Sequence, residues 1–483
     1  MPLDETIREP ERETRVFTRC DVLVVGGGPA GCAAATAAAQ LGADTVLAER
    51  YGHLGGMSTG GFVLWIDRMS DWSGRQVIAG YANDLLSRLP EAGLLGPPRD
   101  AWGSQDPRVV DYWEERHAAW HGTVTWSPTI DPELLKIAYI DTLAEQGVRL
   151  LLHCWAVAPI QEENEIRGVV FESKAGRFAI LAGVVVDATG DGDIFALAGA
   201  PYASDIDGRD IHSTMNVAFR WGGVDADRFE RFRRQHREKY DAIMAKMSDP
   251  ASGGDEPSTG GGGRGAMPWR TPRNDVVYFM GPRLYGYSCV DVEDLTTVEI
   301  ESRRRMLRLL SFYRDNVPGF EGAWIIDTAP QVGVRHSRRL VGTKCVTRQE
   351  WMAGKLHEDE IGVCPPPTPR HPNVSVPLGC LVPARLDNLL AAGRNLSCDP
   401  PSHSFLREIP VCWMMGQAAG VASALAVRSG VRVRDVDVRE VRSHLARQGA
   451  YLNEVSTVPR READSPPESY MLVQEQRNCG TSL

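Results

Sequence analysis

A glycine motif directly behind a short apolar strand constrains this chain more than any other feature. Residues 20–25 read Cys-Asp-Val-Leu-Val-Val, a run typical of a buried parallel strand. Gly26, Gly28 and Gly31 follow as G-x-G-x-x-G. An alanine-rich, helical segment then continues to about Gln40. A strand, a glycine turn and a helix in this order predict a dinucleotide-binding βαβ unit.

Each glycine of the motif has a physical task in such a unit. Gly26 permits the tight turn, Gly28 lets the backbone approach a pyrophosphate, and Gly31 lets the helix pack on the strand. The helix N-terminus offers free N–H groups and positive partial charge to the phosphates. A second strand over residues 44–48 ends at Glu49, whose carboxylate can bind ribose hydroxyls and repels a 2′-phosphate. NADP is therefore disfavoured.

The segments behind three strands decide between FAD and NAD. Residues 50–61 are glycine-dense directly behind the second strand, which a simple NAD unit does not need. Residues 184–193 and 388–395 each read as an apolar strand that ends in a glycine turn. Three such strand ends facing one crevice suit a long dinucleotide. The pattern predicts FAD as the cofactor.

Charge and cysteine usage exclude several classes of protein. The formal net charge of −10 argues against nucleic-acid binding, which needs a basic patch. The 10 cysteines are scattered without C-x-x-C spacing, so no metal site is expected. Free thiols and a charged N-terminal stretch without an apolar run predict a cytoplasmic protein. We expect no stretch apolar enough to span a membrane.

The rest of the chain divides into recognisable segments. Residues 131–147 predict a helix with Asp131 as its N-cap and Pro132 in its first turn. Strands are expected near 148–160, 166–172, 177–188 and 388–393, and a helix over 410–428. The expected domains are a discontinuous FAD-binding domain (16–75, 126–212 and 371–433), a helical insertion (76–125), a substrate domain (213–370), and a C-terminal helix with a polar tail (434–483). The glycine-rich residues 251–266 predict a flexible loop.

Four segments together resemble a known family: residues 21–61, 184–202, 330–343 and 376–425. They are similar to the FAD-dependent oxidoreductases related to the flavoprotein subunits of fumarate reductase and succinate dehydrogenase. Residues 213–225 resemble the start of that subgroup's substrate domain. The resemblance implies an α/β fold with a Rossmann-type, glutathione-reductase-like FAD-binding domain and an inserted α+β substrate domain.

The resemblance also implies which residues bind the cofactor. The expected FAD-binding residues are Gly26, Gly28, Pro29, Ala30, Gly31, Glu49, Arg50, Gly55, Gly56, Met57, Ala188, Thr189, Gly190, Asp191, Gly393, Arg394, Gly416, Gln417 and Ala418. A helix beginning near the last three would aim its N–H groups at the flavin N1/O2 edge. Relatives also attach FAD covalently, and His53 and Cys398 are the nearby candidates. We expect a noncovalent site.

Two clusters are candidates for the chemistry. His403 and Arg407 lie between a strand end and the last core helix, at a spacing that faces the active site in relatives. The histidine could move a proton, and the arginine could hold a carboxylate or stabilise an enolate. The second cluster contains His336 and Arg339. The resemblance leads us to expect an acidic residue where His336 stands.

The predicted function is oxidation of a small organic substrate by hydride transfer to the flavin. Three alternatives stay open: an enoate reductase working in the opposite direction, a monooxygenase or halogenase, and a non-catalytic FAD-binding electron-transfer module. No second G-x-G-x-x-G lies in its own βαβ unit, and no redox C-x₄-C pair is present. Electrons should therefore come from the substrate or an external donor. The sequence leaves the substrate, the electron acceptor and homo-oligomer formation open.

Overall fold

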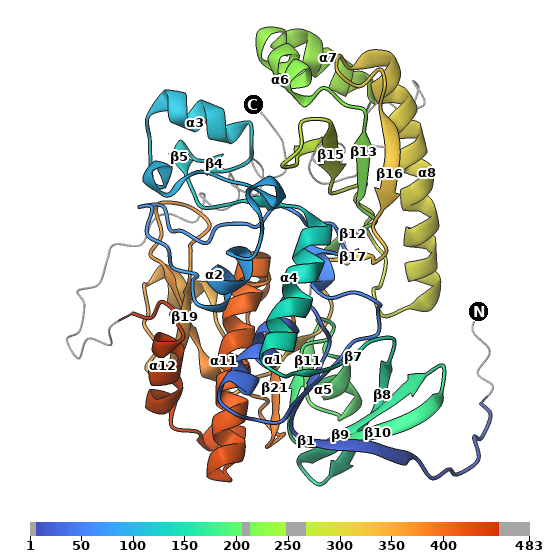
Figure 1. The fold of residues 1–483 in the computed structure, drawn as a ribbon, viewed down its shortest axis with the longest axis vertical. Helices are drawn as coiled ribbons and strands as arrows, with labels where there is room; N and C mark the ends of the chain where they lie inside the picture. The colour runs from blue at the N-terminus through green and yellow to red at the C-terminus, as the bar shows by residue number, and fades with distance from the viewer. Residues whose placement is uncertain (1–5, 205–212, 248–266, 454–483) are drawn as a thin grey trace.

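A mainly parallel sheet, the largest in the described chain, lies in the lower half of Figure 1. The computed structural model describes residues 6–204, 213–247 and 267–453. The glycine-rich segment 251–266 and the tail after residue 456 lie outside these ranges. Strand β1 lies between β2 and β10, β7 pairs with β2, and β21 pairs with β10, all in parallel. The strands are β1 (Arg15–Val25), β2 (Thr45–Ala48), β7 (Arg149–Leu151), β10 (Gly176–Asp187) and β21 (Leu389–Ala391).

Strand β10 pairs with β1 and also with two further strands, β9 and β21. Its first half pairs antiparallel with β9 (Glu165–Ser173), which pairs with β8 (Trp155–Glu162). Its last three residues pair with β21. The strands expected near 166–172, 177–188 and 388–393 are therefore confirmed, with small shifts at their ends. The segment near 148–160 instead forms two strands, β7 and β8, at opposite ends of the sheet. Five parallel strands, β1, β2, β7, β10 and β21, end at the carboxyl edge of the sheet, which is where ligands of open α/β sheets bind.

Two helices approach each other so closely that their contact has no room for a Cβ atom at two positions. Helix α1 (Pro29–Gln40) and helix α11 (Ile409–Ser429) make the most extensive helix–helix contact in the described chain. A Cβ atom on Gly416 would lie 2.1 Å from the carbonyl oxygen of Ala30. One on Gly420 would lie 2.1 Å from that of Ala34. Only glycine fits at these two positions, one helical turn apart.

Helix α11 corrects one expectation. We expected no segment long and apolar enough to cross a bilayer, but α11 meets that test by length and composition. All of its apolar window is buried inside the protein. It packs against α1, β10 and β19 (Glu360–Cys364), among other elements. We therefore describe it as a core helix of this fold.

A second layer stands beside the parallel sheet, at the upper right of Figure 1. It is an antiparallel sheet with strand order β14-β15-β13-β16 and an aromatic core that includes Phe219, Trp221 and Phe279. Its elements are β14 (Trp269–Arg270), β15 (Val276–Phe279), β13 (Phe219–Gly222), β16 (Trp324–Thr328), α6 (Ala226–Gln235), α7 (Arg237–Met247) and α8 (Val292–Asn316). These elements lie within the segment predicted as a substrate domain. The division into domains itself stays a prediction.

Shorter elements complete the fold. Asp131 caps α4 (Pro132–Glu145), since its carboxylate accepts hydrogen bonds from the N–H groups of Glu133 and Leu134, as predicted. The other helices are α2 (Tyr81–Leu86), α3 (Pro107–Glu114), α5 (Asp193–Leu197), α9 (Arg348–Met352), α10 (Pro400–Leu406) and α12 (Val438–Arg447). The remaining strands are β3 (Leu94–Leu95), β4 (Ala119–Trp120), β5 (Thr123–Val124), β6 (Thr129–Ile130), β11 (Tyr202–Ala203), β12 (Met215–Asn216), β17 (Gly333–Val334), β18 (Arg339–Leu340), β19 (Glu360–Cys364) and β20 (Val374–Pro377).

The close approach of α1 and α11 predicts a strong effect of one added methyl group. Gly420→Ala should lower the free energy of unfolding by about 1 to 3 kcal/mol, because the new Cβ must push the two helices apart. Gly322→Ala is the matched control, since its Cβ would meet its nearest neighbour only at 3.4 Å. Thermal and urea unfolding of both variants measure the difference. Equal stability of the two variants would contradict the packing described here.

Candidate functional site

One long cavity opens at the carboxyl ends of the parallel strands. Its volume is about 400 Å³. Residues following β1, β2, β10 and β21 line it, together with residues from the antiparallel layer such as Trp269 and Arg335. Segments that are far apart in the sequence therefore meet around a single space. Its position matches the crevice where dinucleotides bind in such sheets.

The glycine turn at one end of the cavity has no room for side chains. Gly26 has φ +103°, and a Cβ there would lie 2.5 Å from the carbonyl oxygen of Ala188. A Cβ on Gly31 would lie 1.8 Å from the Gly26 carbonyl oxygen. Gly28, in contrast, faces open space on the cavity side. It is also the N-cap of α1, and no side chain caps that helix. A phosphate group of FAD fits this uncapped end.

Glu49 lies beside the turn in the geometry expected of a ribose-binding carboxylate. One of its oxygens accepts a hydrogen bond from the Gly27 N–H at 2.6 Å, and the other from the Tyr51 N–H at 2.8 Å. Burial raises the pKa of this carboxyl above its ordinary value, although the two N–H groups act in the opposite direction. Glu49 also lines the cavity. Both of its oxygens are thus fixed before a ligand arrives.

Arg50 and two aromatic neighbours, Tyr51 and Trp155, form the next part of the lining. The guanidinium of Arg50 stacks 4.9 Å from the ring centre of Tyr51 and 5.2 Å from that of Trp155. All three residues line the cavity. A flat cationic and aromatic surface next to Glu49 suits an adenine ring. The adenosine half of FAD therefore fits here.

The second glycine turn is held by buried carboxylates. Asp187 accepts hydrogen bonds from Thr189 and from two N–H groups at the start of α5, and burial raises its pKa to about 6. Asp191 accepts from Arg394 at 2.7 Å and from Ser337 at 2.7 Å. Burial raises the pKa of Asp191, but Arg394 and Ser337 outweigh it, so the pKa lies below its ordinary value.

The start of α11 corrects the expected contact with the flavin. The helix predicted over 410–428 is confirmed as α11, which begins at Ile409. Gly416 therefore lies seven residues inside this helix, and the expectation that a helix begins near Gly416, Gln417 and Ala418 is wrong. Gly416 packs on α1, Gln417 accepts a hydrogen bond from the Tyr81 N–H, and neither lines the cavity. Glu408 and Ile409 do line it, and no side chain caps the helix. The N–H groups available to a flavin edge belong to this earlier turn.

The predicted cofactor residues fall into two groups. Those that line the cavity are Gly26, Gly28, Pro29, Ala30, Glu49, Arg50, Gly56, Met57, Ala188, Thr189, Gly190, Gly393 and Arg394. Those that stand behind the lining are Gly31, Gly55, Asp191, Gly416, Gln417 and Ala418. The second group shapes the turns and the helix packing. Its members act on a ligand through their neighbours.

The predicted catalytic histidines stand behind the lining as well. His403 is fully buried, and its Nε2 lies 2.9 Å from the carbonyl oxygen of Arg394. Burial lowers its pKa well below the ordinary value, and nearby Arg407 acts in the same direction. The His336 ring packs edge-on against His403 with centres 5.0 Å apart, and Arg339 is buried too. Of the four predicted catalytic residues, only Arg407 lines the cavity.

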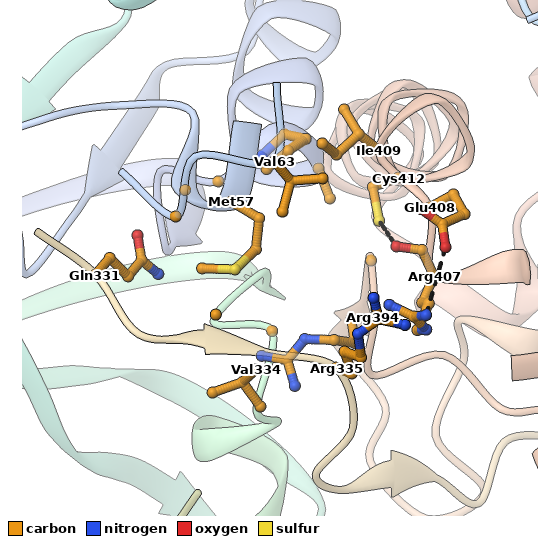
Figure 2. A pocket seen from close by; sticks show the side chains of 18 of the residues that line it. Met57, Val63, Gln331, Val334, Arg335, Arg394, Arg407, Glu408, Ile409 and Cys412 are labelled. Atoms are coloured by element: carbon orange, nitrogen blue, oxygen red, sulfur yellow. Dashed lines mark hydrogen bonds and ion pairs between the residues drawn. The ribbon is translucent and has the colours of Figure 1, made fainter. Parts of the chain in front are cut away.

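A charged chamber occupies the part of the cavity near the start of α11. Figure 2 shows Arg335, Arg394 and Arg407 gathered on one side, with Met57 and Gln331 across from them. Arg407 forms an ion pair with Glu408 at 3.5 Å. Burial lowers the pKa of Arg335 well below its ordinary value, and neighbouring arginines add to the effect.

Asp67 and Arg68 belong to the same chamber and were missed by the sequence analysis. They form an ion pair at 3.1 Å, and both line the cavity. Burial raises the pKa of Asp67 to about 6, and Glu408 adds to the rise while Arg68 and Arg407 oppose it. Arg68 has φ +41°, a strained conformation for a non-glycine residue of a kind that clusters at functional sites. A charged pair at the end of the apolar run 62–66, close behind the glycine-rich loop, was the available signal.

The residues around the cavity also bear on metal binding and on covalent attachment of the flavin. Among residues 6–204, 213–247 and 267–453, no group of three or more His, Cys, Asp or Glu side chains gathers to hold a metal ion. His53 and Cys398, the candidates for covalent attachment of the flavin, do not line the cavity. The observed geometry fits noncovalent FAD.

The chain matches one family along most of its length. The model of the family described as FAD dependent oxidoreductase matches residues 21–445. Digeranylgeranylglycerophospholipid reductase 2 of Methanopyrus kandleri is 29% identical over 178 residues, which cover 35% of this chain and 37% of that protein. The match thus spans little more than a third of that relative. With the topology above, the family match confirms the Rossmann-type fold and FAD as the cofactor.

Solved structures of other proteins are similar to this chain at low sequence identity. A geranylgeranyl bacteriochlorophyll reductase-like protein of Thermoplasma acidophilum has 14% identity and a TM-score of 0.45, with 90% of this chain and 84% of that chain covered. The myxobacterial chondrochloren halogenase CndH has 12% identity and a TM-score of 0.44, with 89% and 79% covered. The comparisons do not single out fumarate reductase or succinate dehydrogenase. They leave the reaction open.

The two hydrogen bonds that fix Glu49 predict its effect on the cofactor. Glu49→Gln should weaken FAD binding by about 1 to 3 kcal/mol, the scale of one charged hydrogen bond, while its amide oxygen can still accept one of the two N–H groups. Titration of the FAD-free protein with FAD, followed by flavin fluorescence, measures the change. Glu114→Gln, at an exposed position on α3, is the control. Unchanged affinity in Glu49→Gln would remove this residue from the FAD site.

Proposed function

Because the chain belongs to the family of FAD-dependent oxidoreductases, we propose that it oxidises a small organic substrate by removing a hydride and a proton. FAD bound in the cavity supplies the hydride acceptor. The residues of the charged chamber bind the substrate and accept its proton. The resemblance of the sequence to fumarate reductase and succinate dehydrogenase flavoproteins supports dehydrogenation as the reaction class.

The position of Asp67 is the observation that carries this proposal. Asp67 lines the cavity, and burial raises its pKa to about 6, within the range useful to a general base near neutral pH. Arg68 at 3.1 Å holds the carboxylate in one orientation. Asp67 therefore takes the proton while hydride leaves the neighbouring C–H bond. It replaces His403 as our candidate for acid–base chemistry.

The arginines of the chamber hold the other end of the substrate. Arg407 is fixed by Glu408 at 3.5 Å, and its side chain is only 11% exposed. Arg335 lies beside it in Figure 2. Guanidinium groups bind carboxylates with two parallel hydrogen bonds and stabilise negative charge that develops on a carbonyl oxygen. They orient the substrate for hydride transfer.

His403 acts as a positioning residue in this proposal. Its ring nitrogen lies 2.9 Å from the Arg394 carbonyl oxygen, and its lowered pKa favours the neutral form, whose Nε2–H can donate to that oxygen. The bond fixes the backbone of the turn from which Arg394 reaches Asp191. Loss of the ring would disturb the lining without removing a proton acceptor.

A reductase acting in the opposite direction is the second candidate. A carboxyl group with a pKa of about 6 is protonated in mildly acidic solution and can donate a proton to a carbon–carbon double bond. The partial relative from Methanopyrus kandleri carries the name of a reductase. The same residues serve both directions, so the pH dependence separates them.

Two further inferences concern the cellular compartment and the molecules that take part in the reaction. The nine cysteines in the described part of the chain are all free, which suits a reducing compartment, and we infer a cytoplasmic enzyme. The electron acceptor is external, and the substrate is a small molecule that reaches the chamber through the cavity.

Anaerobic mixing of the FAD-loaded protein with hydroxy acids, amines, alcohols and saturated acids tests the function. At least one class should bleach the flavin absorbance. With that substrate, Asp67→Asn should retain FAD and slow bleaching by about 10²- to 10⁴-fold, the usual loss for a positioned base. Asp84→Asn, exposed on α2, is the control and should bleach at the normal rate. The proposal fails if no class bleaches the flavin or if Asp67→Asn reacts normally.

The raised pKa of Asp67 also predicts a pH profile. A base with a pKa of about 6 becomes protonated as the pH falls, so kcat/KM for oxidation should decline below about pH 6. A carboxyl group with its ordinary pKa near 4 would stay ionised there. The declining limb should disappear in Asp67→Asn. An increase in rate with falling pH would instead favour the reductase.

A further inference from the structure

Three tryptophans from separate parts of the chain form an aromatic wall in the cavity. Trp65 lies close behind the glycine-rich loop, Trp120 ends β4, and Trp269 begins β14. The ring centre of Trp65 lies 5.8 Å from that of Trp120 and 5.4 Å from that of Trp269. All three residues line the cavity. The aromatic wall is therefore built where the parallel sheet, the short elements of 76–125 and the antiparallel layer meet.

Neighbouring side chains fix these rings. The His117 ring centre lies 3.9 Å from that of Trp269. Trp72, which also lines the cavity, packs edge-on against His121 at 5.3 Å and lies under the Arg68 guanidinium at 5.1 Å. Rings held in this way present flat, rigid faces, which favour stacking with another planar ring over contact with a flexible chain.

The charged chamber of the same cavity carries an excess of positive charge. Five arginines line it, Arg68, Arg283, Arg335, Arg394 and Arg407, against the carboxylates of Asp67 and Glu408 in the lining and that of Asp191 behind it. Arg68 pairs with Asp67, and Arg407 pairs with Glu408.

Arg335 is the cation of this chamber that needs a ligand. In the described part of the chain no carboxylate lies within ion-pair distance of Arg335. Burial and the nearby arginines disfavour its charged form, as its lowered pKa shows. A bound anion would relieve this repulsion.

We propose that the substrate is a flat aromatic anion whose ring stacks on the aromatic wall and whose carboxylate or similar group binds Arg335. This inference rests on the proposed function, because it names the substrate class of the same site. An aliphatic dicarboxylate would use the arginines and leave the aromatic wall without a partner. An uncharged prenyl chain would contact the aromatic wall and leave the charge of Arg335 unmatched.

Binding to the FAD-loaded enzyme tests both halves of the proposal. The probe is 2-naphthoate, and its affinity is measured by perturbation of the flavin absorbance. Two matched probes each lack one feature: 2-naphthamide has no charge, and decahydro-2-naphthoate has no aromatic ring. We expect 2-naphthoate to bind about 10-fold more tightly than either one. Succinate and farnesol are the competing ligand classes.

Substitutions test which residues bind the charged group of the probe and which bind its aromatic ring. Arg335→Gln should raise the Kd of 2-naphthoate about 10- to 100-fold and leave that of 2-naphthamide unchanged. Trp269→Leu and, as a second variant, Trp120→Leu should remove the preference for the aromatic probe over its saturated analogue. Arg304→Gln and Trp324→Leu are the controls, since both residues are exposed and lie outside the lining of this cavity.

Tighter binding of succinate or farnesol than of 2-naphthoate would overturn the proposal, as would an unchanged affinity in Arg335→Gln. The outcome is separable from that of the proposed function. If only aliphatic compounds bleach the flavin, oxidation stands and the aromatic anion is wrong. If 2-naphthoate binds as expected but no compound of any class bleaches the flavin, the binding preference stands and the proposed oxidation falls.

Discussion

Two helix N-termini without side-chain caps open onto one cavity, and the rest of the site depends on this arrangement. Helix α1 begins behind Gly28 and helix α11 behind Glu408. Each contributes N–H groups and positive partial charge at the carboxyl edge of the parallel sheet. The first suits the pyrophosphate of FAD, and the second suits the flavin edge that becomes negative on reduction. Their separation is fixed, because glycines at 416 and 420 lock the two helices together.

The polar lining follows from the same constraint. Carboxylates that would repel the phosphates are either held by backbone N–H groups, as Glu49 is, or paired with arginine, as Asp191 is with Arg394. Asp67 is the carboxylate of the charged chamber whose surroundings push its pKa up to about 6. Burying a carboxylate costs folding free energy. For Asp67 the same burial raises the pKa into a range suited to acid–base catalysis. The site thus combines a preformed cofactor cradle with a carboxyl group in the charged chamber whose pKa is raised by burial.

The nucleotide end of the site could be predicted from the sequence, and the charged chamber only in part, since Arg407 was among the predicted residues and Asp67 was not. Gly26, Gly28 and Glu49 lie within one continuous βαβ unit, whose local spacing determines their geometry. Asp131 was identified as a helix cap for the same reason. The chamber is different, because Asp67, Arg335 and Arg407 come from three distant segments. No spacing along the chain reveals that tertiary packing brings them together.

Local signals also misled in two places. A glycine in an apolar helix can leave room for a ligand or for a neighbouring helix. A Cβ atom on Gly416 would lie 2.1 Å from the carbonyl oxygen of Ala30, so this glycine makes room for helix α1. A histidine near a glycine turn can face a site or support it from behind. Because His403 is completely buried, it supports the turn from behind. Both errors arose because direction and burial are tertiary properties that residue type does not encode.

A crystal structure of the FAD-loaded enzyme is the most direct test of the central claim, that one cavity places the pyrophosphate at α1 and the flavin ring at α11. The account predicts pyrophosphate oxygens on the N–H groups behind Gly28, adenosine ribose on Glu49, and the ring beside Ile409 with Asp67 facing it. A flavin ring remote from the start of α11, or one separated from Asp67 by other side chains, would contradict the account.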